Sequence, residues 1–264
     1  MRILDDISFD IQAEEVFSRL HLDAQGPYAD EINALIDRAR PVARPRAVYE
    51  MAFVQEKTAD AVVIAEATRE LEKALEQGSG RRRAPSPGSR RVGDAGLHEG
   101  RARFVSKVLR SNLDEVERVF PYVASCGPEL DAVPIEDDDL FGQFCRDTIK
   151  DMALHAAMLH LMTHLKEAYS LDGLVTMNPG SGDANVWPIE QQKELFAFFG
   201  DVRELIGVVL TDSFLMVPNK SVSGLFFPSE SGFQSCQLCH REKCSGRRAP
   251  FDPHLWEEKL GSEA

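Results

Sequence analysis

The sequence lacks an excess of basic residues, long apolar stretches and a signal-peptide pattern at its start. Its 264 residues include 30 Lys and Arg against 43 Asp and Glu, so the formal net charge is −13 at pH 7. A surface of this sign repels phosphate groups, and we expect no nucleic-acid partner. No uncharged apolar stretch reaches the roughly 18 residues that a membrane-spanning helix needs, and residues 1–17 lack a basic start followed by an apolar run. The sequence therefore predicts a cytoplasmic protein without a membrane partner.

The composition also excludes a disordered chain, because 43% of the residues are hydrophobic and can form a sizeable core. We predict three parts: an N-terminal helical segment at 1–45, an α/β domain at 46–230, and a cysteine-rich tail at 231–264. Within the domain, residues 78–100 are rich in Gly, Pro, Ser and Arg, which is typical of a flexible surface insertion. Its arginines are either solvated or a docking patch for an acidic partner.

Apolar spacing predicts the helices. It indicates a helix at 10–20, a second at 31–40 that Asp30 can cap, and a long one at 141–170. A shorter helix is expected at 111–119, capped by Ser111 or Asn112. The face of the long helix that we expect in the core consists of Ile149, Met152, Ala153, Ala156, Leu159 and Met162.

Runs rich in β-branched and aromatic residues predict the strands. We expect strands at 46–57, 101–109 and 119–127, and a strand that continues into a helix within 60–77. Two apolar runs on either side of Pro218–Lys220 are expected to form adjoining strands. The strand, helix and strand between 101 and 127 form one α/β unit, and residues beyond the end of such a strand often line a site.

Three of the five cysteines cluster near the carboxyl end, as Cys236, Cys239 and Cys244. An odd number of cysteines without a signal peptide argues against a disulfide framework. Crowded thiolates repel one another, so their clustering indicates a metal that keeps them deprotonated. Thiolate ligands suit an iron–sulfur cluster or zinc. The fourth ligand is left open among three residues and a non-protein group; the three residues are Cys126, Cys145 and His240.

Two other patterns are candidates for a site. The loop Asn178–Asp183 contains Gly180 and Gly182, whose conformational freedom lets a backbone approach a ligand closely, although a tight turn needs the same residues. In the long helix, His160 and His164 lie four residues apart and can present two imidazoles on one face, or simply pack there.

Three segments, in this order along the chain, carry a resemblance to a known family. They are ASCGPEL at 124–130, NPGSGDANVWPIEQQKELFAFFG at 178–200, and IGVVLTDSFLMVPNKSVSGLFF at 206–227. Together they resemble the activation domain of cobalamin-dependent methionine synthase and its short stand-alone relatives. The resemblance covers residues 46–227 apart from the insertion.

The resemblance implies an α/β (α+β) fold, in which helices surround a curved antiparallel sheet. It also implies binding of S-adenosylmethionine by a loop that contains Asn178, Gly180, Ser181 and Gly182, and a cobalamin-facing surface that contains Lys220, Ser221 and Ser223. This sequence has Thr176 and Ser181 where the family loop carries an Arg and a Tyr. The corrinoid is expected on a partner, either a corrinoid protein or methionine synthase.

Two functional hypotheses combine these signals. In the first, Cys236, Cys239, Cys244 and Cys126 hold an iron–sulfur cluster, a low-potential donor supplies an electron, and the chain passes it to cob(II)alamin before S-adenosylmethionine methylates the product. In the second, zinc stabilises the tail and the chain is a scaffold that binds a corrinoid protein without electron transfer. A regulator that binds S-adenosylmethionine or a corrinoid without turnover is a third class.

Overall fold

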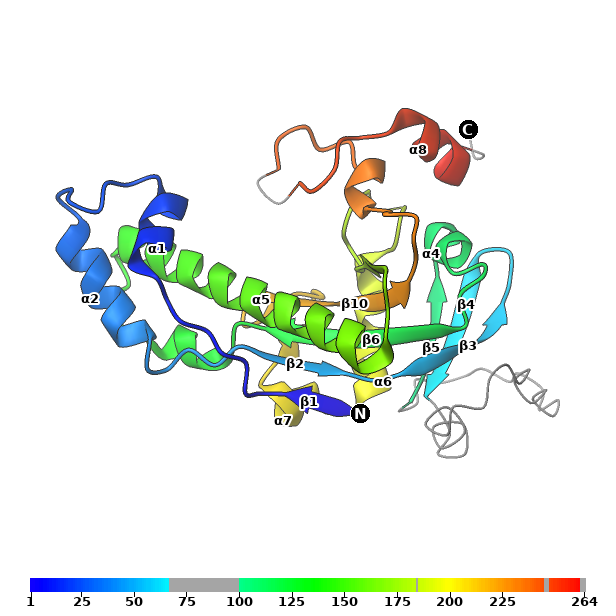
Figure 1. Cartoon of the computed structure of the whole chain (residues 1–264), viewed down its shortest axis with the longest axis horizontal. Coiled ribbons are helices and arrows are strands. Elements are labelled where there is room, and N and C mark those ends of the chain that lie inside the picture. Colours follow the sequence, from blue (N-terminus) through cyan, green and yellow to red (C-terminus); the bar gives the residue numbers. More distant parts are fainter. Residues whose placement is uncertain (67–99, 184, 245–246, 262–264) are drawn as a thin grey trace.

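The structure, a computed structural model, describes residues 1–66, 100–183, 185–244 and 247–261. The predicted insertion at 78–100 and the helical end of 60–77 fall almost entirely outside these residues. An antiparallel sheet forms the centre of the fold, and helices lie on both of its faces (Figure 1). The strands of this sheet are β1 Arg2–Leu4, β2 Arg46–Tyr49, β3 Ala52–Lys57, β4 Ala61–Glu66, β5 Arg101–Val105, β6 Arg118–Ser125, β7 Leu174–Met177 and β10 Ser221–Pro228.

Every strand pair is antiparallel, so the expected fold class is confirmed. The described helices, including the short 3-10 helices labelled η, are α1 Ala13–Leu20, α2 Ala29–Ala39, α4 Lys107–Asn112, η1 Pro128–Ala132, α5 Leu140–Tyr169, η2 Ile189–Gln191, α6 Gln192–Phe199, α7 Val202–Ile206, η3 Ser235–Leu238 and α8 Pro253–Leu260.

Strand β6 is the central strand. One of its edges pairs first with β3, at Val119, and then with β2, at Tyr122 to Ser125. The predicted strand at 46–57 is therefore interrupted at residues 50–51, where it bends and allows β3, β4 and β5 to curve away from the rest of the sheet. The other edge of β6 pairs with β10, which in turn pairs with β7.

Side chains alternate between the two faces of β6, as the pleat requires. Phe120, Tyr122 and Ala124 pack under the C-terminal half of α5, whereas Val119 and Val123 belong to a second cluster with α4 and α6. The tail packs on this second cluster, because Phe233 and Leu238 are buried in it, and α8 lies against α4.

The N-terminal helices have their own apolar cluster, which α1 and α2 form with the N-terminal half of α5. The predicted helix at 10–20 is confirmed as α1. The expected cap at Asp30 is wrong: α2 begins at Ala29, so Asp30 lies inside its first turn. A carboxylate there still interacts favourably with the positive end of the helix dipole.

Helix α5 is confirmed, with 30 residues and Asp139 as its cap, whose side chain accepts a hydrogen bond from the N–H of Gly142. The predicted core face is wrong at Leu159, which is 52% exposed. The buried row instead continues through Ala157, Leu161 and Leu165. Ala157, Leu161 and Leu165 are four residues apart and stay on one side of the helix. The predicted row Ala156, Leu159 and Met162 has steps of three residues, so its side chains turn progressively away from the sheet.

Two other local predictions are wrong. The short helix lies at 107–112 rather than 111–119, because Ser106 accepts a hydrogen bond from the N–H of Leu109 and so caps it earlier. The strands that flank Pro218 do not pair with each other: β9 Met216–Val217 pairs with β8 Val209–Leu210 in a separate sheet. In the part of the chain that the structure describes, no helix is long and apolar enough to cross a membrane.

Candidate functional site

A buried polar cluster lies where β7 leads into the glycine loop. The amide nitrogen of Asn178 donates hydrogen bonds to the Tyr122 hydroxyl at 2.6 Å and to the Ser223 carbonyl at 2.8 Å. The Tyr122 hydroxyl also lies 2.9 Å from Thr176 Oγ1. Burial raises the pKa of Tyr122, so the hydroxyl stays neutral and can pair with both side chains. Three strands, β6, β7 and β10, therefore hold Asn178 in one orientation.

Gly224 makes room for this amide. A Cβ atom at Gly224 would lie 2.4 Å from Asn178 Nδ2 and equally close to the Met177 carbonyl. No ordinary side chain fits there without moving a strand. The glycine in β10 therefore permits the close approach of Asn178 to the sheet.

The loop after Asn178 turns sharply at two glycines. Gly180 has a φ of +77° and Gly182 a φ of +94°, backbone conformations that side-chain-bearing residues rarely adopt. The N–H of Gly180 donates to the Trp187 carbonyl at 2.8 Å, which closes the loop on the buried indole. Ser181 and Gly182 remain half-exposed, so the loop presents polar groups to solvent beside Asn178.

Ser223 lies behind this cluster rather than at its surface. Its hydroxyl donates to Gln192 Oε1 at 3.1 Å, and the Gln192 amide donates to the Phe214 carbonyl at 3.0 Å. Both side chains are buried. Ser223 thus supports the strand that positions Asn178, and Gln192 links it to α6.

The cysteine-rich tail runs directly beside the glycine loop. A Cβ atom built on Gly182 would lie 3.1 Å from the Ser235 carbonyl, and His240 Nδ1 lies 3.8 Å from Asp183 Oδ2. The His240 ring packs on Phe251, with the ring centroids 4.3 Å apart. The tail is therefore one wall of the region around the loop.

Arg247 organises the tail. Its guanidinium donates to the carbonyls of Cys236 and Cys239, at 3.2 and 3.1 Å, and to that of Ala249 at 3.1 Å, besides a contact with the Arg241 carbonyl. These bonds gather the backbone of Cys236, Cys239, Arg241 and Ala249 around one guanidinium. The N–H of Arg248 lies 3.5 Å from Cys236 Sγ and donates to it.

The cysteine cluster has the donor chemistry of a metal site but not its assembled geometry. Cys236 and Cys239 are half-buried, Cys244 is exposed, and the backbone N–H of Arg248 donates to Cys236 Sγ. Among the described residues, no group of three or more His, Cys, Asp or Glu side chains is close enough to hold a metal ion.

Cys126 lies in the core between α5 and the N-terminal helices. Its thiol donates to the Gly127 carbonyl at 3.3 Å, and burial raises its pKa to about 12. Burial likewise raises the pKa of Cys145 to about 11. Both are protonated core thiols at neutral pH, which is the common state of a buried cysteine.

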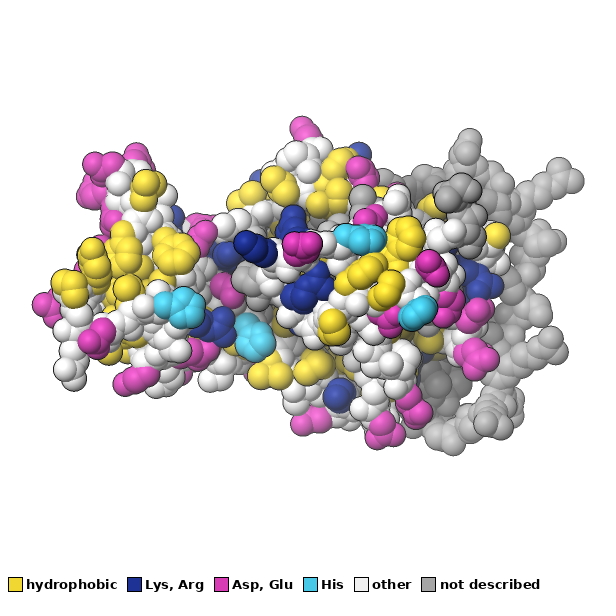
Figure 2. All heavy atoms as spheres, turned by 90° about the horizontal axis from the view of Figure 1, so that it is seen from above, with side chains coloured by type: hydrophobic (Ala, Val, Ile, Leu, Met, Phe, Trp, Pro, Cys, Tyr) yellow, Lys and Arg dark blue, Asp and Glu magenta, His cyan; other side chains and the backbone are white. Residues whose placement is uncertain are grey.

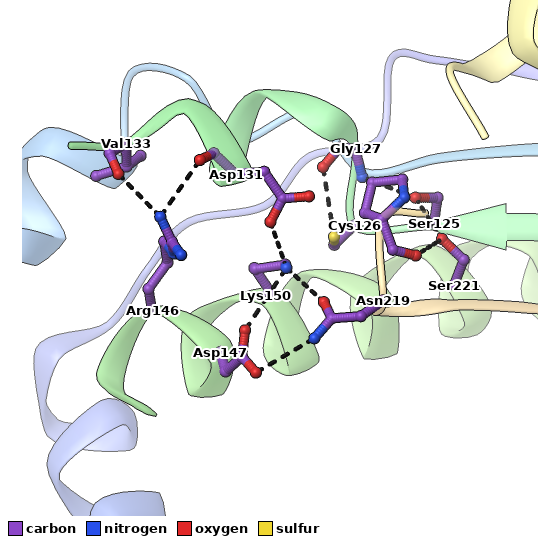
Figure 3. A network of polar contacts seen from close by, with 11 residues as sticks. Ser125, Cys126, Gly127, Asp131, Val133, Arg146, Asp147, Lys150, Asn219 and Ser221 are labelled. Carbon is purple, nitrogen blue, oxygen red and sulfur yellow. Dashed lines mark hydrogen bonds and ion pairs between the residues drawn. The ribbon is translucent and has the colours of Figure 1, made fainter. Parts of the chain in front are cut away.

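Ser221, the first residue of β10, belongs to a second polar network (Figure 3), and Lys220 precedes it in the chain. The Lys220 carbonyl accepts the N–H of Cys126 at 3.0 Å, and the Ser221 hydroxyl donates to Ser125 Oγ at 2.9 Å. The predicted cofactor-facing residues thus divide between two places: Asn178 and Ser223 share one cluster, whereas Ser221 faces the other network.

Lys150 is the centre of this network. It is 3% exposed, and its ammonium contacts Asp131 and Asn219 and lies 3.5 Å from Asp147. Asn219 in turn donates to Asp147 at 3.3 Å. The network lines an open hollow of about 420 Å³. The single positive charge of Lys150 is paired with two carboxylates and one amide oxygen, so its first role is structural.

Sequence reasoning missed Tyr122, Gln192 and Lys150. Tyr122 and Asn178 are 56 residues apart, and no local spacing relates them. Of the two alternatives for the histidine pair, His164 agrees with packing: its Nε2 lies 2.8 Å from the Tyr49 hydroxyl, so this imidazole packs on the sheet. Burial lowers the pKa of His164, which favours the neutral ring.

Among the comparisons with known proteins, the one with solved structures is informative. No family model and no curated protein matches the sequence. Among solved structures, the chain is similar to the crystal structure of the MetH reactivation domain bound to AdoHcy, with 14% sequence identity and a TM-score of 0.50. The match covers 89% of this chain and 81% of that one. At this identity it shows the fold, and it agrees with the resemblance carried by residues 46–227.

Proposed function

We propose that this chain binds a nucleoside that carries an amino acid, of the S-adenosylmethionine or AdoHcy type, and supports the reductive reactivation of a corrinoid held by a partner protein. The observation that supports it most is the likeness to an AdoHcy-bound reactivation domain over 89% of the chain, together with a glycine loop that starts at a firmly held Asn178. A corrinoid protein or cobalamin-dependent methionine synthase is the proposed partner.

Asn178 is the proposed anchor of the ligand. Both hydrogen bonds of its side chain use the amide nitrogen, and no hydrogen bond to its Oδ1 occurs among the described residues. An acceptor with a set direction suits an amino or hydroxyl donor of the ligand. Gly180, Ser181 and Gly182 are proposed to contact the same ligand through the loop.

In this proposal the corrinoid-facing role belongs to the start of β10 and the residues just before it. Lys220 and Ser221 are half-exposed there, and Leu215 and Val217 beside them are 61% and 50% exposed. Exposed apolar side chains next to polar ones are typical of a surface that a partner covers. Ser223 contributes indirectly, by holding Gln192 and β10 in place.

The tail is proposed to bind a metal through Cys236, Cys239 and Cys244, as an iron–sulfur cluster or as zinc. Cys126, which the sequence suggested as a fourth ligand, is 0% exposed in the core, so the proposal rests on the three tail cysteines. In this proposal Cys236, Cys239 and Cys244 would hold the metal. An iron–sulfur cluster there would supply the one electron that returns cob(II)alamin to cob(I)alamin, with a low-potential donor as its source, whereas zinc would only stabilise the tail. Anaerobic metal and sulfide analysis of the wild type and Cys239→Ser distinguishes the two.

Calorimetric titration with AdoHcy tests the ligand. We expect saturable binding to the wild type, a loss of about tenfold for Asn178→Ala, and no more than a twofold change for Asn185→Ala. Asn185 is a matched control because it lies in the same loop and is exposed. A wild type that binds neither AdoHcy nor S-adenosylmethionine at millimolar concentration contradicts the proposal.

The reactivation role has a separate assay. A corrinoid protein in the cob(II)alamin form is mixed with titanium(III) citrate and S-adenosylmethionine, with and without this chain. We expect methylcobalamin to form faster in its presence, as its absorption spectrum reports. An unchanged rate contradicts the reactivation role and leaves ligand binding to be judged by the titration.

A further inference from the structure

Arg248 differs from the other arginine beside it in the tail. Arg247 uses its guanidinium to bind backbone carbonyls of the tail, at 3.1 to 3.2 Å for Cys236, Cys239 and Ala249. Arg248 is exposed, and in the part of the chain that the structure describes its guanidinium makes no hydrogen bond or ion pair. Arg247 therefore stabilises the fold of the tail, whereas the Arg248 guanidinium is available to a ligand.

The backbone places Arg248 next to the glycine loop. Its N–H donates to Cys236 Sγ at 3.5 Å, and Cys236 directly follows Ser235, whose carbonyl would lie 3.1 Å from a Cβ atom on Gly182. Two contacts thus connect Arg248 to the loop that the proposed ligand would occupy. Since Arg247 holds the tail in this arrangement, the position of Arg248 does not depend on its own side chain.

The charge of Arg248 reaches the polar cluster beneath the loop. Burial raises the pKa of Tyr122, and the positive charge of Arg248 is among the influences that oppose this rise. Tyr122 is the side chain that binds Asn178. On a chain with a net charge of −13, the face that carries the tail nevertheless gathers Lys and Arg side chains near its middle (Figure 2).

We infer that the cysteine-rich tail completes the ligand site and that Arg248 binds the carboxylate of the ligand's amino-acid part. A guanidinium suits this task because it pairs with a carboxylate through two parallel hydrogen bonds. The inference rests on the proposed function, since it concerns the same ligand. It assigns to the tail a part in recognition that does not require a metal.

A consequence concerns Cys236. Its sulfur accepts the N–H of Arg248, so a change at this sulfur shifts the backbone that carries the carboxylate-binding side chain. A ligand held by Arg248 should in turn restrict this backbone and so alter the access of a reagent to the Cys236 sulfur. Bound AdoHcy is expected to slow alkylation of Cys236 by iodoacetamide more than alkylation of Cys244, which is exposed.

The decisive experiment compares two ligands that differ only in the carboxylate: AdoHcy and decarboxylated AdoHcy. Calorimetry on the full chain measures both affinities for the wild type, Arg248→Ala, Arg248→Lys and Arg241→Ala. We expect Arg248→Ala to lower AdoHcy affinity about tenfold and to leave the affinity for the decarboxylated ligand within twofold. Arg248→Lys should retain part of the affinity, because it keeps the charge and loses the paired geometry.

Arg241→Ala is the matched control. Arg241 is an exposed arginine of the same tail whose backbone carbonyl, not its side chain, binds Arg247. If Arg248→Ala weakens both ligands equally, or neither, the inference is wrong and the proposed function stands. If the wild type binds neither ligand, the proposed function fails and this inference with it. Thermal melting of each variant shows that the exposed substitutions leave the fold intact.

Discussion

Replacing Gly224 by alanine should disturb the site and the sheet together. The added Cβ would lie 2.4 Å from Asn178 Nδ2 and 2.4 Å from the Met177 carbonyl. The amide can move, but Met177 cannot move freely, because β7 pairs with β10 at Leu225. The substitution must therefore push the two strands apart or displace Asn178 from its two hydrogen bonds.

The expected cost follows from these contacts. Overpacking of a dense interior destabilises by about 1–3 kcal/mol, and each hydrogen bond lost by a buried amide adds about 1 kcal/mol. We expect a total of about 3 kcal/mol. For a domain of this size, about 1 kcal/mol corresponds to roughly 2–4 °C, so the melting temperature should fall by about 6–12 °C.

Thermal denaturation followed by circular dichroism measures this effect, and a second substitution tests its cause. Asn178→Ala removes one of the two clashing partners, so the double variant should be less destabilised than the sum of the single variants. Gly232→Ala is the control, because no atom lies within 4 Å of its Cβ and only its φ of +63° costs stability. A shift below about 2 °C for Gly224→Ala, or strict additivity with Asn178→Ala, would refute this account of the site.

Other predictions concern the buried groups. In metal-free native protein, we expect the three tail cysteines to react quickly with Ellman's reagent, and Cys126 and Cys145 only after denaturation, because they are 0% and 1% exposed; five fast thiols would contradict the structure. Burial raises the pKa of both core thiols in the folded state, to about 12 and about 11, so the unfolded chain loses protons first above about pH 9. Stability in urea should therefore fall as the pH rises from about 9 toward 11, and a flat profile would argue against protonated core thiols. Lys150→Met should lower the free energy of unfolding by about 2 kcal/mol. This is less than the loss of a fully buried ion pair would cost, because Asp131 and Asp147 are 39% and 41% exposed. Chemical denaturation of the variant and the wild type measures the difference. No change would mean that the network does not stabilise the fold.

Local patterns were sufficient for elements whose signals lie within one segment. Helix α5 and the start of the glycine loop were predicted from periodicity and glycine spacing, because these depend on neighbours in the sequence. The cap of α4 could not be predicted in this way, since Ser106, Ser111 and Asn112 are all residues that cap helices well. The choice among them depends on the pairing of Arg118 and Val119 with β3, which requires these two residues to be in a strand.

The site was predictable only in part. Asn178 and Gly180 stand out in the sequence, but the reason why Asn178 can approach the sheet lies at Gly224, and its hydroxyl partner is Tyr122. Both positions read locally as ordinary strand residues. Ser221 and Ser223 look equivalent in the sequence, yet their neighbours on β6 and α6 assign them to different networks.

Helix α5 has a mechanical consequence for any partner. At about 1.5 Å per residue its 30 residues form a rod of about 45 Å. Its N-terminal and C-terminal halves pack into two different apolar clusters. The bundle around α1 and α2 and the strands under Ala157 and Leu165 must therefore tilt together. A corrinoid protein that bound at either end would therefore contact a single rigid body. Its binding would not require two flexibly linked halves to be aligned first.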